Sequence, residues 1–179
     1  MPRSAKPRPV AAYAVEETSV GPLVVAAGEG KLLAVKFASG RHGARGAVEE
    51  LHRELRDDFD LVMDADAVRP LMQRVLDCLD GRCTAFDVDL DLSRLTPFQR
   101  EVLLEVARLP RGSVATYAEI AGRIGRPTAY RAVGNALGIN PMPVVIPCHR
   151  VVGGDGIGGF GGGLAVKRRL LANEGVTFP

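Results

Sequence analysis

The chain has 179 residues, enough to bury a hydrophobic core as one large domain or two small ones. Hydrophobic residues make up 46% and charged residues 25%, a globular composition that excludes an intrinsically disordered chain. The net charge of +2 is too small to indicate a nucleic-acid partner by itself, and no apolar run approaches the roughly 20 residues of a membrane-spanning helix.

The first nine residues are basic and rich in proline, but no apolar signal-peptide segment follows them. We therefore expect a flexible tail over residues 1–9 and a cytoplasmic protein without a membrane anchor. The three cysteines, Cys78, Cys83 and Cys148, match neither a disulfide framework nor a CxxC zinc module, so reduced thiols are expected.

The next part of the chain predicts a small sheet with helices. Two Val-rich runs flank Gly28-Glu29-Gly30 and predict a β-hairpin over residues 21–37. Helical spacing predicts helices over residues 47–59 and 68–82, the second with Pro70 in its first turn. In residues 86–93, alternating hydrophobic residues and aspartates favour a strand or extended segment with one solvated face over a carboxylate metal site. Together these elements predict an N-terminal α/β domain over residues 10–93.

After residue 93 the pattern becomes helical. Thr96 as N-cap, Pro97 at the first helical position and Pro110 as the stop predict a helix between them. Two further short helices, separated by Gly125-Arg126-Pro127, suggest a helix-turn-helix. We expect a mostly helical domain over residues 94–179, and an α/β (α+β) fold for the whole chain.

The second helix of this pair carries a core-facing stripe at helical spacing, formed by Ala129, Ala132, Val133, Ala136 and Leu137. Arg131 lies opposite that stripe and points away from the protein. The side chains around Arg131 are small or uncharged, which suits the minor groove of DNA better than base reading in the major groove. An ordinary surface helix with one solvated arginine is the alternative, because exposed arginines are common.

The segment Pro147-Cys148-His149 precedes a run of eight glycines in residues 153–163. A cysteine nucleophile needs a base to form its thiolate, and His149 is a candidate, with Glu174 available to orient the imidazole ring. A buried structural cysteine remains the alternative. Zinc binding is less favoured because adjacent residues share a metal poorly. The glycines match GxGxxG literally, but no helix begins there, so a nucleotide site is discounted.

The segments NPMPVVIPCHRVV and GGFGGGLAVKRRLLANEG resemble the O6-alkylguanine-DNA alkyltransferase family. Its hallmark is a Pro-Cys-His-Arg sequence behind a helix-turn-helix. The similarity is continuous from about Thr96 to Gly175, and it includes TPFQREVLLEVARLPRGSVATYAEIA and AYRAVGNALGINP. It implies direct-reversal DNA repair: a methylated-DNA–protein-cysteine S-methyltransferase, acting once, moves the alkyl group of O6-alkylguanine, and also of O4-alkylthymine, onto the protein.

Carried over by position, the resemblance implies a role for each of several residues. Cys148 would accept the alkyl group, His149 would take the thiol proton through a water, and Glu174 would hold the imidazole ring. Tyr117 would donate a proton to the leaving guanine, and Asn140 would tie the recognition helix to the active-site strand. Arg131 would fill the gap left by the flipped nucleotide. The remaining DNA and substrate contacts would come from Thr96, Ala129, Tyr130, Gly134, Pro143, Val151, Phe160 and Gly161.

The resemblance also implies double-stranded DNA as the partner, bound through the minor groove by a monomer, with no cofactor. Two positions depart from the family pattern. Phe160 replaces the usual tyrosine and Gly161 stands where some relatives have serine, which suggests an altered range of alkyl groups. Some relatives carry a structural zinc, but here His42, His52, Cys78 and Cys83 match its ligands by residue type only, so no metal is expected.

Three other functions compete with alkyl transfer. An alkyltransferase-like protein binds the lesion without repairing it, but such proteins lack the acceptor cysteine that this chain has. A helix-turn-helix regulator would leave Cys148 and the glycine run unexplained. A cysteine hydrolase would need an acyl pocket with amide donors, which the sequence does not indicate.

Overall fold

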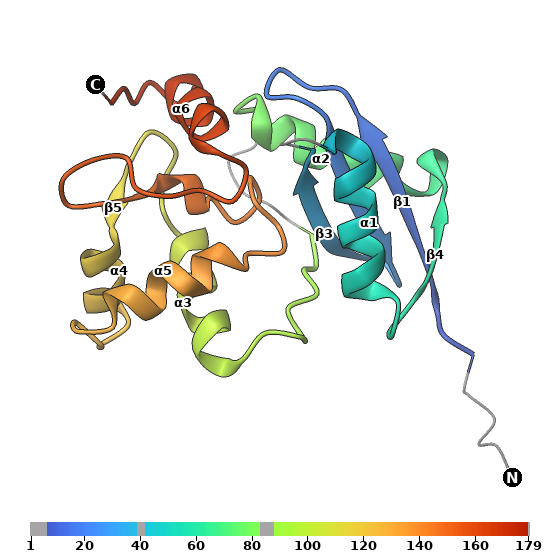
Figure 1. Cartoon of the computed structure of the whole chain (residues 1–179), viewed down its shortest axis with the longest axis horizontal. Helices are drawn as coiled ribbons and strands as arrows, with labels where there is room; N and C mark the ends of the chain where they lie inside the picture. The colour runs from blue at the N-terminus through green and yellow to red at the C-terminus, as the bar shows by residue number, and fades with distance from the viewer. Residues whose placement is uncertain (1–6, 39–41, 83–87, 179) are drawn as a thin grey trace, which may run out of the picture.

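The computed structural model describes residues 7–38, 42–82 and 88–178. A sheet-containing N-terminal half and a mostly helical C-terminal half lie side by side (Figure 1). This is the α+β arrangement expected from the sequence. Among the described residues, no helix is both long and apolar enough to cross a bilayer.

The sheet has four strands in the order β3-β2-β1-β4. Antiparallel pairing joins β1 (Val10–Glu16) to β2 (Leu23–Gly28) and β2 to β3 (Lys31–Phe37), while β4 (Asp60–Met63) runs parallel to β1. The predicted hairpin is confirmed as β2 and β3. Glu29 and Gly30 form its turn with φ of 51° and 76°, the positive values that a tight two-residue hairpin needs.

The two faces of the sheet are covered by different elements. Along β2, Val24 and Ala26 belong to the hydrophobic cluster that includes α1 (Gly43–Leu55), whereas Val25 and Ala27 belong to the cluster that includes α2 (Ala65–Leu79). This alternation is the two-residue period of a strand that is buried on both faces. The sheet is therefore the centre of the N-terminal half.

Both predicted helices of this half exist, but their bounds differ from the expectation. The first ends at Leu55 rather than at residue 59. The second begins at Ala65 because the side chain of Asp64 accepts hydrogen bonds from two backbone N–H groups and starts the helix a turn earlier. Pro70 consequently lies inside α2 and not in its first turn, which corrects the expectation.

The C-terminal half begins with α3 (Pro97–Ala107), whose predicted start is confirmed. Thr96 and Gln99 form a reciprocal capping box, and Pro97 is the first helical residue. The helix-turn-helix is formed by α4 (Tyr117–Arg123) and α5 (Tyr130–Gly138). Their cluster with α3 buries Val133 and Ala136, but Ala132 is exposed, because the core covers only a narrow strip of α5.

The two halves meet at the free edge of β3. Leu32 exchanges backbone hydrogen bonds with the segment at residues 89–91, and the N–H of Val35 donates to the carbonyl of Pro141 at 2.8 Å. Of the segment predicted as a strand at 86–93, residues 86 and 87 lie outside the described residues, and Leu90 makes an isolated bridge to Leu32. The segment at residues 89–91 and the C-terminal half thus together cover the strand edge that would otherwise be open.

Three short elements complete the C-terminal half. The 3-10 turn η1 (Cys148–Arg150) leads into β6 (Val151–Val152), which pairs in parallel with β5 (Ala115–Thr116). Helix α6 (Leu164–Asn173) follows the glycine-rich loop, and its residue Leu170 packs in the same cluster as the sheet.

Candidate active site

Cys148 is held at the junction of the two halves. It begins η1 directly after Pro147, and only 7% of the residue is exposed. Proline has a fixed φ, so the backbone that presents the thiol is restrained on its N-terminal side. The free thiol of Cys148 is therefore buried at a fixed position.

Two adjacent cavities open onto Cys148, and Phe160 lines both. The first, which we call the helix-side cavity, has a volume of about 280 Å³ and reaches Tyr117 and Gly134 of the helix-turn-helix. Its glycine-rich lining leaves room for a flat ligand to lie against backbone. A group bound there would have one edge at the sulfur atom.

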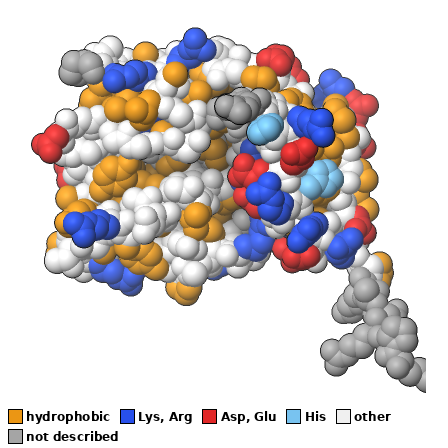
Figure 2. Space-filling view, viewed as in Figure 1, with side chains coloured by type: hydrophobic (Ala, Val, Ile, Leu, Met, Phe, Trp, Pro, Cys, Tyr) orange, Lys and Arg blue, Asp and Glu red, His pale blue; other side chains and the backbone are white. Residues whose placement is uncertain are grey.

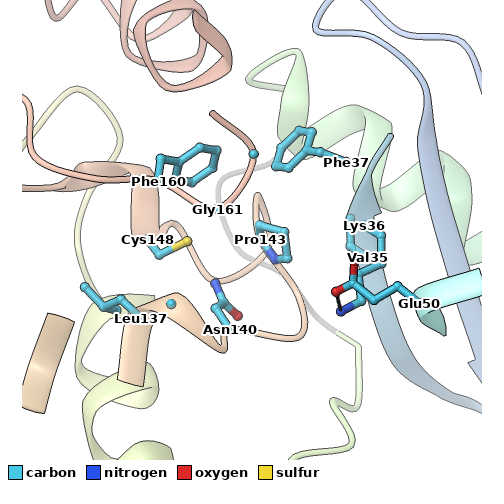
Figure 3. Close-up of a pocket in the computed structure, with 12 residues that line it drawn as sticks. Val35, Lys36, Phe37, Glu50, Leu137, Asn140, Pro143, Cys148, Phe160 and Gly161 are labelled. Atoms are coloured by element: carbon cyan, nitrogen blue, oxygen red, sulfur yellow. Dashed lines mark hydrogen bonds and ion pairs between the residues drawn. The ribbon is translucent and has the colours of Figure 1, made fainter. Parts of the chain in front are cut away.

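The second, which we call the sheet-side cavity, has a volume of about 120 Å³ and lies between Cys148 and strand β3. Figure 3 shows the sulfur of Cys148 directed toward Pro143, with the rings of Phe160 and Phe37 on one side of the cavity and Asn140 on the other. Its apolar walls next to the sulfur would suit a small hydrocarbon group.

Asn140 fastens the end of α5 to the segment that leads to Cys148. Its side-chain amide donates to the carbonyl of Ile146 at 2.9 Å, and its side-chain oxygen accepts from the N–H of Met142 at 3.0 Å. An asparagine that uses both ends of its amide holds two backbone segments in one register. The structure therefore places Asn140 between the end of α5 and the segment that leads to Cys148, which lies in a 3-10 turn and not in the strand named in the sequence analysis.

His149 and Glu174 are in direct contact, as expected from the sequence. Nε2 of His149 lies 2.8 Å from Oε1 of Glu174, and the two side chains are 3% and 4% exposed. If Nε2 carries the proton of the neutral ring, Nδ1 presents a free lone pair. That Nδ1 atom is buried and has no hydrogen-bond partner among the described residues. Burial lowers the pKa of His149, so the ring is neutral at physiological pH.

Arg150 adds three contacts to the same carboxylate. Its Nε and Nη2 atoms lie 2.9–3.2 Å from the oxygens of Glu174, and the N–H of Gly112 also donates to that carboxylate at 3.1 Å. Burial alone would raise the pKa of Glu174, but the hydrogen bonds from His149 and Arg150 hold it at about 2. Glu174 is therefore a permanently charged anchor for the imidazole ring.

Burial raises the pKa of the Cys148 thiol to about 11, so the resting residue is a neutral thiol. The fully buried ammonium of Lys167 opposes this shift through its charge. Lys167 donates to the carbonyl of Val151 at 2.6 Å and to the carbonyl of Gly159 at 3.0 Å. Burial lowers its own pKa to about 8. Lys167 therefore joins both sides of the glycine-rich loop and places a positive charge near the sulfur.

Tyr117 stands where the helix-turn-helix meets the glycine-rich loop. It is the first residue of α4 and lines the helix-side cavity. A Cβ added at Gly158, whose φ is 70°, would lie only 3.0 Å from the hydroxyl oxygen of Tyr117. Both the backbone angle and the space thus require glycine at 158, and the Tyr117 hydroxyl faces that loop.

The outer side of α5 is exposed and nearly free of acidic groups. Arg131 is exposed and its guanidinium lies 5.8 Å from the ring centroid of Tyr130, which is 46% exposed. Ala129 is the residue that precedes the helix. Figure 2 shows mostly uncharged side chains and backbone over this half, whereas the opposite half carries intermixed acidic and basic groups. Thr96 is the N-cap residue of α3.

The possible zinc ligands do not form a centre in the part of the chain that the structure describes. No group of three or more His, Cys, Asp or Glu side chains there is arranged to hold a metal ion. Cys83 lies outside the described residues. Cys78 is disulfide-bonded, so the expectation of reduced thiols is wrong for this residue, and Cys148 has the free thiol.

Comparison with known proteins places this site in a family. Residues 97–176 match the family model described as the 6-O-methylguanine DNA methyltransferase, DNA binding domain. A methylated-DNA–protein-cysteine methyltransferase of Methanosarcina acetivorans is 35% identical over 164 residues, which cover 91% of this chain and 97% of that protein. The chain belongs to the methylated-DNA–protein-cysteine methyltransferase family. The solved structure of Mycobacterium tuberculosis OGT in complex with DNA has 34% identity and a TM-score of 0.75, covering 92% of this chain and 93% of that one.

Other members of the family match over a shorter region. The protein of that name from Methanothermobacter thermautotrophicus is 45% identical over 113 residues, which are 62% of this chain and 63% of the relative. The match thus spans less than two thirds of that relative. The region of resemblance quoted from the sequence, Thr96 to Gly175, is nearly the span of the family model. The longer alignments also extend over the N-terminal half.

Sequence reasoning missed three residues of the site. Arg150 follows His149 in the quoted motif, but its three contacts with Glu174 depend on the position of α6. Lys167 looks like one of several surface cations of α6, since a single lysine in a helix gives no signal of burial. Phe37 lies in the N-terminal hairpin, and its place in the sheet-side cavity depends on how the halves pack.

Proposed function

We propose that this protein repairs DNA by moving the alkyl group of O6-alkylguanine, and also of O4-alkylthymine, onto the sulfur of Cys148. Each molecule acts once, because the product is a thioether that no group of the site can cleave. The observation that carries the proposal is the position of Cys148, a buried thiol shared by two cavities, with a His149–Glu174 pair beside it. Family membership supports the same reaction.

The base must leave the duplex to reach this thiol. A methyl group on guanine O6 cannot be approached inside stacked DNA, and extruding a nucleotide costs a few kcal/mol. The flipped guanine occupies the helix-side cavity, held by backbone groups at Cys148, Val151 and Gly161. The alkyl group then points past the sulfur into the sheet-side cavity, where Pro143 and Phe160 form its walls.

Proton transfer prepares the nucleophile. Nδ1 of neutral His149 accepts the thiol proton through one water molecule, and the negative charge of Glu174 stabilises the imidazolium that forms. Lys167 stabilises the thiolate electrostatically. The neutral resting thiol of Cys148 is consistent with deprotonation after substrate binding, since the thiolate is needed only when the alkylated base is in place.

The displacement itself involves one bond made and one broken. The sulfur lone pair forms a bond to the alkyl carbon, and the carbon–O6 bond breaks with its electrons passing into the guanine ring. Tyr117 donates its hydroxyl proton to a ring nitrogen of the guanine, which makes the base a better leaving group. The proton on His149 returns to the Tyr117 oxygen through solvent, so the balance is a restored guanine and an S-alkylcysteine.

DNA binding is assigned to the exposed side of α5. The slim, uncharged surface around Ala129 and Gly134 supports entry into the minor groove, where contacts to the backbone and groove shape dominate. Arg131 inserts into the stack in place of the flipped nucleotide, with Tyr130 beside it. Thr96 contacts the phosphate backbone from the N-terminus of α3. A monomer in the cytoplasm, without a cofactor, is sufficient for these steps.

The two halves of the chain have different roles. Residues 94–179 carry the DNA-binding and alkyl-acceptor groups, and residues 10–93 support them. The hydrogen bond from Val35 to Pro141 and the shared hydrophobic cluster support this arrangement. An alkyltransferase-like protein that only binds the lesion is not favoured, because the acceptor Cys148 is present with its neighbouring base.

A peptide-mass experiment tests the proposal. The protein is mixed with a duplex that contains one O6-methylguanine, then digested, and the peptide with Cys148 is weighed. We expect the mass of one added methyl group on that peptide, and no gain in Cys148→Ala. Tight binding to the duplex without any gain in mass would assign the protein to lesion recognition instead.

A further inference from the structure

The sheet-side cavity is closed by two aromatic rings that come from different halves of the protein. Phe37 is the last residue of β3, and Phe160 belongs to the glycine-rich loop. Their ring centroids are 5.6 Å apart with an interplanar angle of 60°, an edge contact of the kind that aromatic pairs prefer. Both rings line the cavity next to Cys148 (Figure 3).

Phe37 is the more firmly held of the two rings. Its strand pairs with β2, where Phe37 lies opposite Leu23, and the following N–H of Ala38 donates to the carbonyl of Pro22 at 2.8 Å. Val35 in the same strand donates to Pro141, so the strand is also tied to the C-terminal half. The sheet therefore fixes Phe37 independently of the loop.

The loop that carries Phe160 is held by a hydrogen bond from α6 and by close packing near Gly162. Behind it, the carbonyl of Gly159 accepts a hydrogen bond from Lys167. On another side, the buried Gly162 lies close to both rings. A Cβ added to Gly162 would lie 2.7 Å from Phe37 and 2.8 Å from Phe160. Only glycine therefore fits at 162, and the loop backbone lies close to both rings, which are in edge contact with each other.

We propose that Phe37 is a specificity-determining residue: by packing against Phe160 it fixes the outer wall of the sheet-side cavity and sets the largest alkyl group that the protein removes. The inference rests on the proposed function and adds to it a residue of the N-terminal half. Phe160 lacks the hydroxyl of the tyrosine that is usual in the family, and that hydroxyl was expected to help seal the alkyl pocket. In this protein the Phe37 ring closes the pocket instead. The cavity has a volume of about 120 Å³, so a methyl group fills only part of it and a bulkier alkyl group would reach the wall formed by Phe37 and Phe160.

The test compares transfer rates from two duplexes of the same sequence, one carrying O6-methylguanine and the other O6-benzylguanine. Phe37→Ala removes the ring, so Phe160 can swing outward. We expect the ratio of benzyl to methyl rates to rise about tenfold, and to rise less in Phe37→Leu, which keeps the strand apolar and protects the fold. A ratio within twofold of wild type in both variants, or a lower ratio, would overturn the inference.

Phe59→Ala is the matched control. Phe59 is 8% exposed and packs in the cluster on the other side of the sheet, with α1. The Phe59→Ala variant also loses a phenylalanine ring from the N-terminal half, but that ring does not line the cavity. Its ratio of benzyl to methyl transfer rates should therefore equal that of wild type. A rise as large as in Phe37→Ala would attribute the effect to general loosening and overturn the inference. The same experiment distinguishes a failure of the proposed function from a failure of this inference. If the proposed function is wrong, the wild-type protein transfers neither the methyl nor the benzyl group.

Discussion

Glu174 lies 2.8 Å from Nε2 of His149, although 25 residues separate them in the chain. The contact joins α6 to the turn that carries Cys148, and Arg150 binds the same carboxylate. One buried anion thus fixes both residues that follow the thiol. Its charge is balanced within the cluster, which is the condition for a stable buried ion pair.

Replacing Glu174 with glutamine should slow methyl transfer by about 10- to 100-fold, because the imidazolium that forms during proton transfer loses its counter-charge. Stopped-flow or quench measurements with a methylated duplex give the rate. Binding to unmethylated duplex is the control and should be unchanged. Wild-type transfer by Glu174→Gln would show that the carboxylate only supports the fold.

The same substitution should change the acid stability of the protein. The folded pKa of Glu174, about 2, lies below its ordinary value of 4.5. Its stabilising contribution is therefore complete above pH 4.5 and is lost as the pH falls toward 2. Urea unfolding should show wild type losing on the order of 2 kcal/mol over this window, and Glu174→Gln losing less. Equal slopes for the two proteins would contradict the depressed pKa.

The pH dependence of transfer should reflect His149 rather than free ionisation of the thiol. Burial lowers the pKa of His149 below 6.5, so the base is ready throughout the range from pH 6.5 to 8.5. Single-turnover rates should be nearly constant from pH 6.5 to about 7.5, fall at more acidic pH as His149 gains a proton, and fall above about pH 8 as Lys167 loses its charge. A tenfold increase per pH unit would instead show that hydroxide removes the proton from a thiol whose pKa is about 11.

Lys167→Met should slow transfer at least tenfold and also destabilise the protein. The methionine fills the same space but leaves the carbonyls of Val151 and Gly159 without their donor, at a cost of about 1–3 kcal/mol. Denaturant unfolding and transfer rates measure the two effects. Arg168→Met on the exposed side of α6 is the control: it loses the hydrogen bond to the carbonyl of Phe178, so it should destabilise the protein less than Lys167→Met and leave the transfer rate unchanged. A stability loss with a wild-type rate would restrict Lys167 to holding the loop.

Arg131→Ala should weaken repair of duplex DNA more than reaction with a free O6-alkylguanine base, because only the duplex requires a flipped nucleotide to be replaced. The exposed position predicts a change in unfolding free energy within about 0.5 kcal/mol. Arg45→Ala, at an 88% exposed arginine side chain of α1, is the matched control and should leave both reactions unchanged. Equal losses on both substrates would contradict the flipping role of Arg131.

Short sequence patterns were enough to predict the turns and helix ends that depend only on neighbouring residues. The hairpin at Gly30, the N-cap at Thr96 and the break at Gly125 each depend on neighbouring residues, and all three appear where expected. Strands β1 and β4 were not predicted. The early start of α2 was missed because the capping effect of Asp64 outweighs the presence of Pro70.

The candidate active site was predictable only in part, because several of its contacts join residues that are far apart in the sequence. Cys148 and His149 are adjacent, and their motif draws attention to both. Arg150 and Lys167 are chemically ordinary cations in the sequence, and only tertiary packing makes one a partner of Glu174 and buries the other. Phe37 could not be found at all from sequence, because its contact with Phe160 spans both halves of the chain.

The most direct test of the account is a titration of guanine restored per protein molecule. A fixed amount of protein is given increasing amounts of duplex with one O6-methylguanine, and the restored guanine is counted after the reaction is complete. We predict a plateau at one guanine per protein, with the methyl group found on Cys148. Continued repair beyond one per protein, or restored guanine with Cys148→Ala, would contradict transfer to this thiol.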